Sequence, residues 1–440
     1  MRANRLVGGE GKGRNPSPLH QTAMKLLWAL TGPVAQSSRR HAMVLGPPGT
    51  PYCLGLFHFD MKFPRDYPNT APAVHITTTS GGTVRFNPNL YATGKVCLSI
   101  LGTWRAESSG EMWSAVQSVS SVLMSIQSLM HDAPYHNEPS FEKDDGSGDP
   151  QKYNDKILHE SLRVGVCEVM EETLEPRPNS PNGVTPMFAH TRRQLFLMYY
   201  DRYISECMRM ATGEPNAREG TEFKMMPFEC RTNGMTGTFQ WSKIKTRLSC
   251  VREMLMHEVE TWKLQGAEQT LMLKESHDAA VNSCVHHLLQ QEERIKREVP
   301  AGASIGIDPT NACIWTATLF GPADGYWDGG MFTVELIFPP DFPDAPPVVR
   351  FLTPIVHPQI NQQGVPYLRA LIMWPYAELR ERSIATVMRQ LVELLAHEPS
   401  PEPATHINPE AAALYFSRSD EERNEYKRRV KRCVQRSMDM

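Results

Sequence analysis

Cys97 and Asn89 are the residues whose types and spacing could do chemistry, because the cysteine follows the asparagine by eight positions. Pro88 has no amide hydrogen and favours extended geometry in the residue before it, so this stretch is a loop and not the interior of a helix. A thiolate can attack a carbonyl carbon, and a neutral amide such as that of Asn89 can donate a hydrogen bond to the oxyanion that forms. The pair is therefore suited to acyl transfer through a thioester.

The side chains beside Cys97 alternate in character. Val96, Leu98 and Ile100 are apolar and stand at every second position, which predicts a short extended ledge. Because apolar side chains on one side leave the thiol on the other, we expect the sulfur of Cys97 to point away from the core and to be exposed. The alternative interpretation is a small buried hydrophobe without chemistry, as most lone cysteines are.

No histidine lies in this loop, and His131 and His136 are the first ones downstream within forty residues. A cysteine protease needs a base that forms the thiolate and later activates water, so the sequence disfavours a protease. Exchange between thioesters needs only a thiolate fraction near neutral pH and a leaving thiol of similar basicity. Thioester exchange is the chemistry that the loop favours.

Further motifs extend this pattern on both sides of the loop. In chain order they are GPPGTPY (46–52), FHFDMKFPRDYP (57–68), RFNPNLY (85–91), GKVCLSIL (94–101), Trp113 and VLMSIQSLM (122–130). Over roughly residues 17–165, their order and spacing resemble the catalytic core of ubiquitin-conjugating enzymes. The details NPNLY, CLSILGTW and PYHNEP (134–139) resemble most the branch of that family that contains the giant conjugating enzyme BRUCE/apollon.

The resemblance implies a role for each residue of the loop. Cys97 would accept ubiquitin as a thioester from a ubiquitin-activating enzyme and pass it to a lysine of a protein substrate. Asn89 would bind the oxyanion or hold the loop, and Trp113 would pack beneath the loop. ATP would be consumed upstream, and neither a metal nor an organic cofactor is implied.

The resemblance also implies that Glu138 and Asn137 receive and orient the attacking lysine. An amine attacks only when it is neutral, so an acceptor that holds it beside apolar walls is useful. The alternative is that both residues are solvated loop residues. We expect His136 to be a surface or hydrogen-bonded residue and not a base.

Two positions depart from the family pattern where a RING-type ubiquitin ligase docks. Asn69 follows Tyr67-Pro68 in place of an aromatic residue, and Ala115 replaces a proline. A ubiquitin ligase would therefore dock atypically, and combined conjugating and ligating action, as in the BRUCE-like branch, is an alternative. The polar insert TWRAESSGEM (103–112) predicts a flexible flap, which is either a tolerated insertion or a piece that positions the acceptor.

The pattern returns from Gly321 onward as an internal repeat. The stretches 321–332, 338–348 and 357–368 match 46–57, 63–73 and 87–98, which places Gln359 at the position of Asn89 and Tyr367 at that of Cys97. A phenol cannot carry a thioester and is a weak nucleophile at neutral pH. The second copy is therefore predicted to be inactive, and the resemblance implies a module that binds ubiquitin or substrate, or steers the choice of lysine. Cys313, the thiol nearest to Tyr367 in the sequence, lies in a predicted strand, and we expect it to be buried in the core.

The elements predict an α+β protein with two ubiquitin-conjugating-type folds, each a four-stranded antiparallel sheet flanked by helices, joined by a helical connector. The predicted division is a flexible N-terminus (1–16), a catalytic core with a helical C-terminal extension (17–212), a linker (213–237), a long helical segment (238–298) and an inactive core (299–440). Within the first core we predict helices over 20–30, 115–130, 152–175 and 185–211 and strands over 40–45, 54–63 and 73–78. The short distance between residues 30 and 46 leaves room for a short first strand or none, and the long helical segment should break near Gln265-Gly266.

Composition bounds the class of protein. A chain of 440 residues with 40% hydrophobic and 22% charged residues can bury two or three cores, and its net charge of −3 gives no reason to expect nucleic acid or a membrane surface as a partner. Nine cysteines without a C-x-x-C pair argue against a disulfide framework and a zinc site, so we expect a cytosolic or nuclear location. No secretory signal and no run of eighteen apolar residues is found in this sequence. The basic run KRRVKR (427–432) is expected to be a solvated face, with an acidic partner as the alternative.

Two rival functions stay open at this point. One is a non-catalytic ubiquitin-binding scaffold, and the other is a conjugating enzyme for another ubiquitin-like modifier. A thiol-sensitive adduct that is lost in Cys97→Ala would exclude the scaffold, and offering several modifiers would separate the enzymes.

Overall fold

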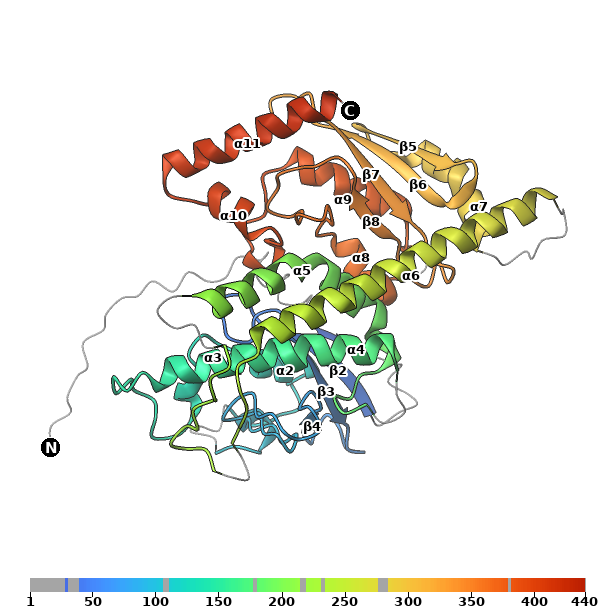
Figure 1. Cartoon of the computed structure of the whole chain (residues 1–440). Helices are drawn as coiled ribbons and strands as arrows, with labels where there is room; N and C mark the ends of the chain where they lie inside the picture. The colour runs from blue at the N-terminus through green and yellow to red at the C-terminus, as the bar shows by residue number, and fades with distance from the viewer. Residues whose placement is uncertain are drawn as a thin grey trace.

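A computed structural model of the chain contains two antiparallel sheets of four strands each, with helices around and between them (Figure 1). The structure describes residues 28–30, 39–105, 111–176, 180–213, 219–230, 234–275, 284–378 and 381–439. The predicted α+β class with two four-stranded antiparallel sheets is confirmed. The predicted flexible N-terminus (1–16) and part of the predicted flap (106–110) lie outside the described residues.

The first sheet has the strand order β1-β2-β3-β4. Its strands are β1 (Trp28–Leu30), β2 (Arg39–Leu45), β3 (Leu56–Lys62) and β4 (Ala73–Ile76). A short first strand is thus present, and the prediction that a helix extends through Leu30 is wrong, because residues 28–30 pair with Val44, Met43 and Ala42 of β2. Residues 20–27 of that predicted helix lie outside the described residues.

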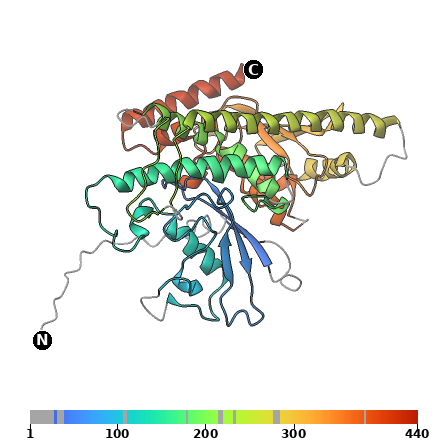
Figure 2. The same cartoon turned by 60° about the horizontal axis from the view of Figure 1, so that its bottom comes forward.

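Both faces of the first sheet are covered, as the burial along β2 shows. Ala42 and Val44 face a core cluster that includes Val122, Leu123 and Ile126 of α2 (Val119–Leu129). Met43 and Leu45 face the opposite way, into a second cluster. Figure 2 shows the helical run that covers this second face lying across the strands. That run consists of α3 (Asp149–Leu162), a π-helical turn (Arg163–Glu168) and α4 (Val169–Leu174).

Two long helices lie between the sheets (Figure 1). They are α5 (Ala189–Thr212), preceded by a 3-10 turn (Pro186–Phe188), and α6 (Trp241–Glu275). The predicted break near Gln265-Gly266 is wrong, since α6 runs through both residues. The glycine serves a close approach instead: a Cβ at Gly266 would lie 2.6 Å from Asn311 Oδ1 and 2.7 Å from Cys313 Cβ.

The second sheet repeats the strand order as β5-β6-β7-β8. Its strands are β5 (Ala303–Asp308), β6 (Asn311–Phe320), β7 (Met331–Ile337) and β8 (Val348–Phe351). Its helices are α7 (Cys284–Glu298), α8 (Arg369–Met373), α9 (Ile384–Ala396), α10 (Pro409–Tyr415) and α11 (Asp420–Met438), with 3-10 turns at Trp374–Tyr376 and Pro403–Thr405. Cys313 lies on β6 and is 3% exposed, so its predicted place in the core is confirmed.

Details of the turns show that the repeat is structural as well as sequential. Among the described residues, each copy has one cis peptide before a proline, at Tyr67-Pro68 and at Phe342-Pro343. In each copy a tryptophan Nε1 donates to the carbonyl oxygen of that proline at 2.8 Å, Trp113 in the first and Trp374 in the second. Trp113 therefore packs against the Tyr67-Pro68 turn.

Candidate active site

The loop that carries Cys97 is shaped by tight turns. Gly94 has a φ of 89° and donates its N–H to the Tyr91 carbonyl at 2.9 Å, which closes the first turn. Its own carbonyl accepts from the Ile76 N–H at 2.9 Å, and a Cβ on Gly94 would lie 2.9 Å from the Ile76 oxygen. Glycine is thus required both for the backbone conformation and for the approach to β4. The chain then enters the segment of Cys97 in a fixed direction.

Cys97 is held from both sides along the main chain. Its N–H donates to the Asn89 carbonyl at 2.9 Å, and its carbonyl accepts from Asn89 Nδ2 at 3.0 Å. Thr103 returns from the other side, where its Oγ1 donates to the Val96 carbonyl at 2.7 Å and accepts from the Leu98 N–H at 3.0 Å. Asn89 therefore braces the backbone of the cysteine segment, and oxyanion binding by its side chain stays a prediction.

The thiol itself is covered. Cys97 is 1% exposed, so the prediction of an exposed sulfur is wrong for this conformation. The chain passes Cys97 on both sides, at Asn89 and at Thr103, and a short side chain between two such segments lies below their surface. The core cluster around its apolar neighbours does not include Cys97, which agrees with a thiol that points away from that core.

Charge and burial act on the thiol in opposite directions. Burial raises the pKa of the Cys97 thiol, while the positive charges of Lys95 and Arg85 oppose that rise. A raised pKa reduces the thiolate fraction at neutral pH and makes the sulfur a poorer leaving group.

Asn87 is the hub of the hydrogen bonds beneath the loop. Its Nδ2 donates to Tyr52 Oη at 2.8 Å and to the Leu129 carbonyl at 2.9 Å. Its Oδ1 accepts from the Asn89 N–H at 2.9 Å and from Asn137 Nδ2 at 3.3 Å. Asn87 is fully buried, so these bonds replace its contacts with water. The network ties Asn137 to the loop that carries Asn89.

Glu138 joins the same assembly through Arg85. The guanidinium Nη2 of Arg85 lies 3.3 Å from Glu138 Oε2 and donates to the Pro88 carbonyl at 2.7 Å. Burial raises the pKa of the Glu138 carboxyl, and the Arg85 charge opposes that rise. A carboxylate with a raised pKa is a better proton acceptor near neutral pH than a solvated one. The four predicted site residues are thus linked by hydrogen bonds around one loop.

Three other positions singled out in the sequence lie outside this hydrogen-bond assembly or at its edge. His136 Nδ1 bonds to the Phe141 carbonyl at 2.7 Å, so it is a hydrogen-bonded residue of the 3-10 turn Pro134–Asn137 (η3). Asn69 and Ala115, which mark the atypical docking surface, are both exposed. Whether a ligase docks there stays a prediction.

The second copy keeps the backbone of this loop and changes its side chains. The Tyr367 N–H donates to the Gln359 carbonyl at 2.8 Å, as Cys97 does to Asn89. His357 replaces Asn87: its Nδ1 accepts from the Gln359 N–H and its Nε2 bonds to the Leu394 carbonyl, both at 2.9 Å. Burial raises the pKa of Tyr367 to about 12. The phenol thus stands at the cysteine position in a protonated state at neutral pH.

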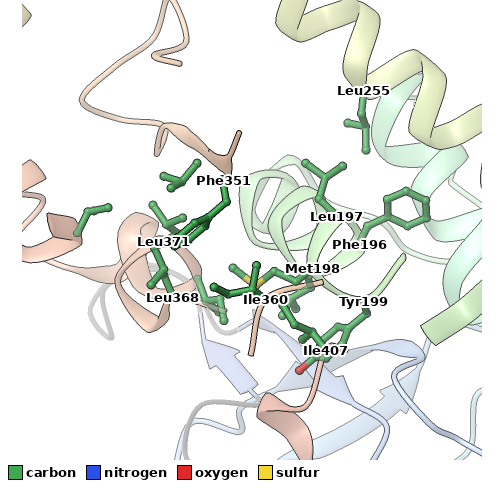
Figure 3. Packing of buried hydrophobic residues seen from close by; sticks show 14 of the residues in the cluster. Phe196, Leu197, Met198, Tyr199, Leu255, Phe351, Ile360, Leu368, Leu371 and Ile407 are labelled. Atoms are coloured by element: carbon green, nitrogen blue, oxygen red, sulfur yellow. The ribbon is translucent and has the colours of Figure 1, made fainter. Parts of the chain in front are cut away.

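Helix α5 covers the loop of the second copy (Figure 3). The side chain of Asn361, within that loop, donates to the Leu197 carbonyl at 2.9 Å, and Asp201 accepts from the Gln362 N–H at 2.7 Å. Apolar side chains of α5, of α6 and of the second copy form one cluster here. Labelled in Figure 3 are Phe196, Leu197, Met198, Tyr199, Leu255, Phe351, Ile360, Leu368, Leu371 and Ile407.

Sequence reasoning missed three residues of the site: Arg85, Asn87 and Thr103. Arg85 is 3% exposed in its side chain, and its guanidinium lies 4.5 Å from the centre of the Tyr91 ring. Arg85 is part of the RFNPNLY motif, but its contact with Glu138 spans fifty-three residues, so no local pattern predicts it. Only the Asn87 role had a local signal, since an asparagine two residues before Asn89 can accept the Asn89 N–H.

The described residues were also compared with the requirements of a metal site and of a membrane-spanning helix. Among them, no three histidine, cysteine or acidic side chains gather in a way that could hold a metal ion. None of the helices described is both long and apolar enough to cross a membrane.

Comparison with known proteins gives two matches to one family model, described as ubiquitin-conjugating enzyme, at residues 27–157 and 287–434. Together the two segments make up more than half of the chain. The first segment contains Cys97 and the second contains Tyr367.

Several curated proteins are similar to part of the chain. The ubiquitin-conjugating enzyme E2 Z of Homo sapiens is 50% identical over 167 residues, which are 38% of this chain and 44% of that protein. The protein of the same name from Danio rerio is 42% identical over 216 residues, which are 49% of this chain and 59% of that protein. The dual E2 ubiquitin-conjugating enzyme/E3 ubiquitin-protein ligase BIRC6 of Homo sapiens is 42% identical over 131 residues, 29% of this chain and 3% of that protein. The chain thus spans about half the length of the first two relatives.

Proposed function

Because the chain belongs to the ubiquitin-conjugating enzyme family, we propose that its first copy carries ubiquitin as a thioester on Cys97 and transfers it to lysines of protein substrates. The observation that supports this best is the double hydrogen bond between Asn89 and the main chain of Cys97, at 2.9 and 3.0 Å. The partners would be ubiquitin, a ubiquitin-activating enzyme and the substrate proteins. A ubiquitin ligase would dock atypically at Asn69 and Ala115.

The first step is an exchange of thioesters. The Cys97 thiol loses its proton to solvent, and its sulfur attacks the carbonyl carbon of ubiquitin held on the activating enzyme. The new C–S bond forms, the bond to the activating enzyme's sulfur breaks, and that sulfur leaves as a thiolate. The positive charges of Lys95 and Arg85 favour the Cys97 thiolate against the effect of burial. Because Cys97 is 1% exposed, its cover must move when ubiquitin arrives.

The second step is attack by a neutral lysine amine on the thioester carbon. The C–N bond forms, the C–S bond breaks, and Cys97 leaves as a thiolate. Glu138 accepts the proton that the amine loses, for which its raised pKa suits it. Asn137, fixed by bonds to Asn87 and to His131, orients the turn that holds Glu138.

Asn89 holds the loop in both steps. One Nδ2 hydrogen bonds the Cys97 carbonyl, and the amide has a second hydrogen that could meet the oxyanion. Its Oδ1 is buried without a hydrogen-bond partner among the described residues, so a turn of the side chain breaks no bond to that oxygen. We propose bracing as its main role and oxyanion binding as its second.

The second copy acts without catalysis in this proposal. Its cysteine-equivalent loop packs against α5, so contact with ubiquitin or substrate would use other surfaces of that copy. We keep the predicted division into a catalytic core (17–212), a linker (213–237), a helical segment (238–298) and an inactive core (299–440). All nine cysteines are free, which supports the proposed cytosolic or nuclear location.

A second candidate function is a ubiquitin-binding scaffold in which both copies are inert. The observation that favours it is the 1% exposure of Cys97. The whole chain incubated with activating enzyme, ATP and tagged ubiquitin decides between the two. An enzyme gives an adduct that thiols remove and that Cys97→Ala lacks, and a scaffold gives none. Parallel reactions with other ubiquitin-like modifiers test the choice of cargo.

A further inference from the structure

The segment between α5 and α6 folds back onto the first copy. Two limbs, residues 219–223 and 237–240, pair in antiparallel fashion: Phe223 N–H donates to the Gly237 carbonyl at 2.8 Å, and Phe239 N–H to the Thr221 carbonyl at 2.9 Å. We call residues 219–230 and 234–240 the connecting hairpin. Met226 and Met235, beyond the paired limbs, are 1% and 2% exposed and belong to the core cluster of the first copy.

A buried ion pair anchors the connecting hairpin on α3. Lys156 Nζ lies 2.8 and 2.7 Å from the two carboxylate oxygens of Glu229, and both side chains are 1% exposed. The same carboxylate accepts from the Met226 N–H at 2.8 Å, and Lys156 also donates to the Lys224 carbonyl at 3.3 Å. Buried charges are tolerated only when they are paired in good geometry. The anchor therefore fixes the hairpin in one position relative to α3.

Phe228, next to this anchor, contacts the turn that carries the proposed lysine acceptors. Its ring centre lies 5.2 Å from that of Tyr135, within η3, and 5.4 Å from that of Phe141. These are distances at which aromatic rings attract each other. Tyr135 stands three positions before Glu138, whose N–H bonds to the Tyr135 carbonyl.

Phe228 also borders Arg85, the residue that holds Glu138. The Arg85 guanidinium lies 5.9 Å from the Phe228 ring and 4.5 Å from the Tyr91 ring. Arg85 is thus enclosed between the hairpin and the cysteine loop while it bonds Glu138 and the Pro88 carbonyl. Phe228 therefore borders both Tyr135, whose carbonyl accepts from the Glu138 N–H, and Arg85, which bonds the Glu138 carboxylate.

We propose that Phe228 is a positioning residue for transfer to lysine, which acts through Tyr135 and Arg85 to aim the carboxylate of Glu138. This inference rests on the proposed function of Cys97. The main chain of Cys97 bonds to Asn89, and Thr103 bonds the adjacent Val96 and Leu98, so none of these hydrogen bonds involves the hairpin. Formation of the thioester therefore depends little on Phe228, and its discharge to an amine depends on it.

The test uses the whole chain, charged with ubiquitin and then chased with free lysine. In Phe228→Ala we expect charging within about twofold of the wild type and discharge slowed about tenfold. Without the ring to enclose it, Arg85 holds Glu138 less well, so the pH below which discharge falls should move upward. Phe228→Tyr keeps the ring and should restore both the rate and the pH profile.

Phe223→Ala is the matched control. Phe223 lies on the same hairpin, but its ring contacts His159 at 5.2 Å and Phe239 at 4.7 Å. Its loss should leave the rate and pH profile of discharge unchanged. If Phe228→Ala does not fold, Phe228→Leu, which keeps apolar bulk without the ring, takes its place.

The inference is overturned if the ring-less variant discharges like the wild type, or if charging and discharge fall equally in it and in Phe223→Ala. A wild-type chain that forms no thioester refutes the proposed function instead. The two failures are therefore distinguishable in one experiment.

Discussion

The two copies share the backbone of the central loop and differ in what surrounds it. Cys97 and Tyr367 both donate their N–H to the residue eight positions earlier, at 2.9 and 2.8 Å. In the first copy Asn89 turns its amide back to the Cys97 carbonyl, whereas Gln359 Oε1 accepts from the Ser400 N–H at 3.0 Å. The loop therefore keeps its turn geometry even where Cys97 and Asn89 are replaced by Tyr367 and Gln359.

The neighbours of the loops differ as well. In the second copy α5 packs against the loop. Tyr199 Oη, on α5, donates to the Ala404 carbonyl at 2.7 Å. In the first copy the connecting hairpin lies beside Arg85 and the η3 turn. The hydrogen bonds of Cys97 are made within its own loop, to Asn89. One loop has become a packing surface, and the other keeps a buried polar network with a thiol at its edge.

The sharpest way to break this comparison is to give the second copy a thiol. In a Cys97→Ala background, Tyr367→Cys should form no detectable adduct with ubiquitin, because α5 covers the surface where a modifier's tail would lie. Charging reactions followed by non-reducing electrophoresis measure this. A thiol-sensitive adduct on that variant would show that side-chain identity alone separates the copies.

Asn87 and His357 hold equivalent loops with different side chains, so removing each compares their contributions to stability. Asn87→Ala removes the hydrogen bonds to the Tyr52 hydroxyl, the Leu129 carbonyl and the Asn89 N–H, which should lower the free energy of unfolding by about 3 kcal/mol. Denaturant unfolding measures the loss. His357→Ala is the control in the second copy and should leave ubiquitin charging intact. Equal stability of Asn87→Ala and the wild type would contradict the hub role.

Glu138 tests the chemistry proposed for the first copy. Glu138→Gln should slow discharge to free lysine by about 10²-fold at neutral pH and leave charging unchanged, because the amide cannot accept the proton. Burial raises the wild-type pKa of Glu138, so wild-type discharge should fall as the pH decreases through that raised value, above the ordinary 4.5. The variant should lack this fall. An identical pH profile in both would remove Glu138 from the mechanism.

The smallest expected effect is the loss of one tryptophan hydrogen bond in each copy. Trp113→Phe and Trp374→Phe each remove one Nε1–carbonyl hydrogen bond of 2.8 Å. Each should lower the free energy of unfolding by about 1–2 kcal/mol. Thermal or denaturant unfolding of both variants checks this. A change at only one site would show that the shared turn contributes differently to the free energy of unfolding in the two copies.

Local patterns in the sequence predicted the loop and its repeat well. The spacing of eight residues between Asn89 and Cys97 recurs as a backbone hydrogen bond in both copies. The helix break at Gly266 was predicted wrongly because glycine is a usual helix terminator, and only the contact with β6 shows why it is there. Likewise, the pairing of residues 28–30 with β2 depends on distant partners.

The parts of the site that the sequence did not predict depend on long-range contacts. Arg85 meets Glu138 across fifty-three residues, and Lys156 meets Glu229 across seventy-three. No periodicity marks such pairs. The exposure of Cys97 was also predicted wrongly, because alternation fixes the side to which a side chain points and not what covers it.

The most direct test of the account is the mass of the chain after one round of charging with activating enzyme, ATP and ubiquitin. The account predicts one ubiquitin per chain, joined through a thiol-sensitive bond that maps to Cys97, and no adduct on the second copy. A chain that gains no mass, or an adduct that persists in Cys97→Ala, would contradict it.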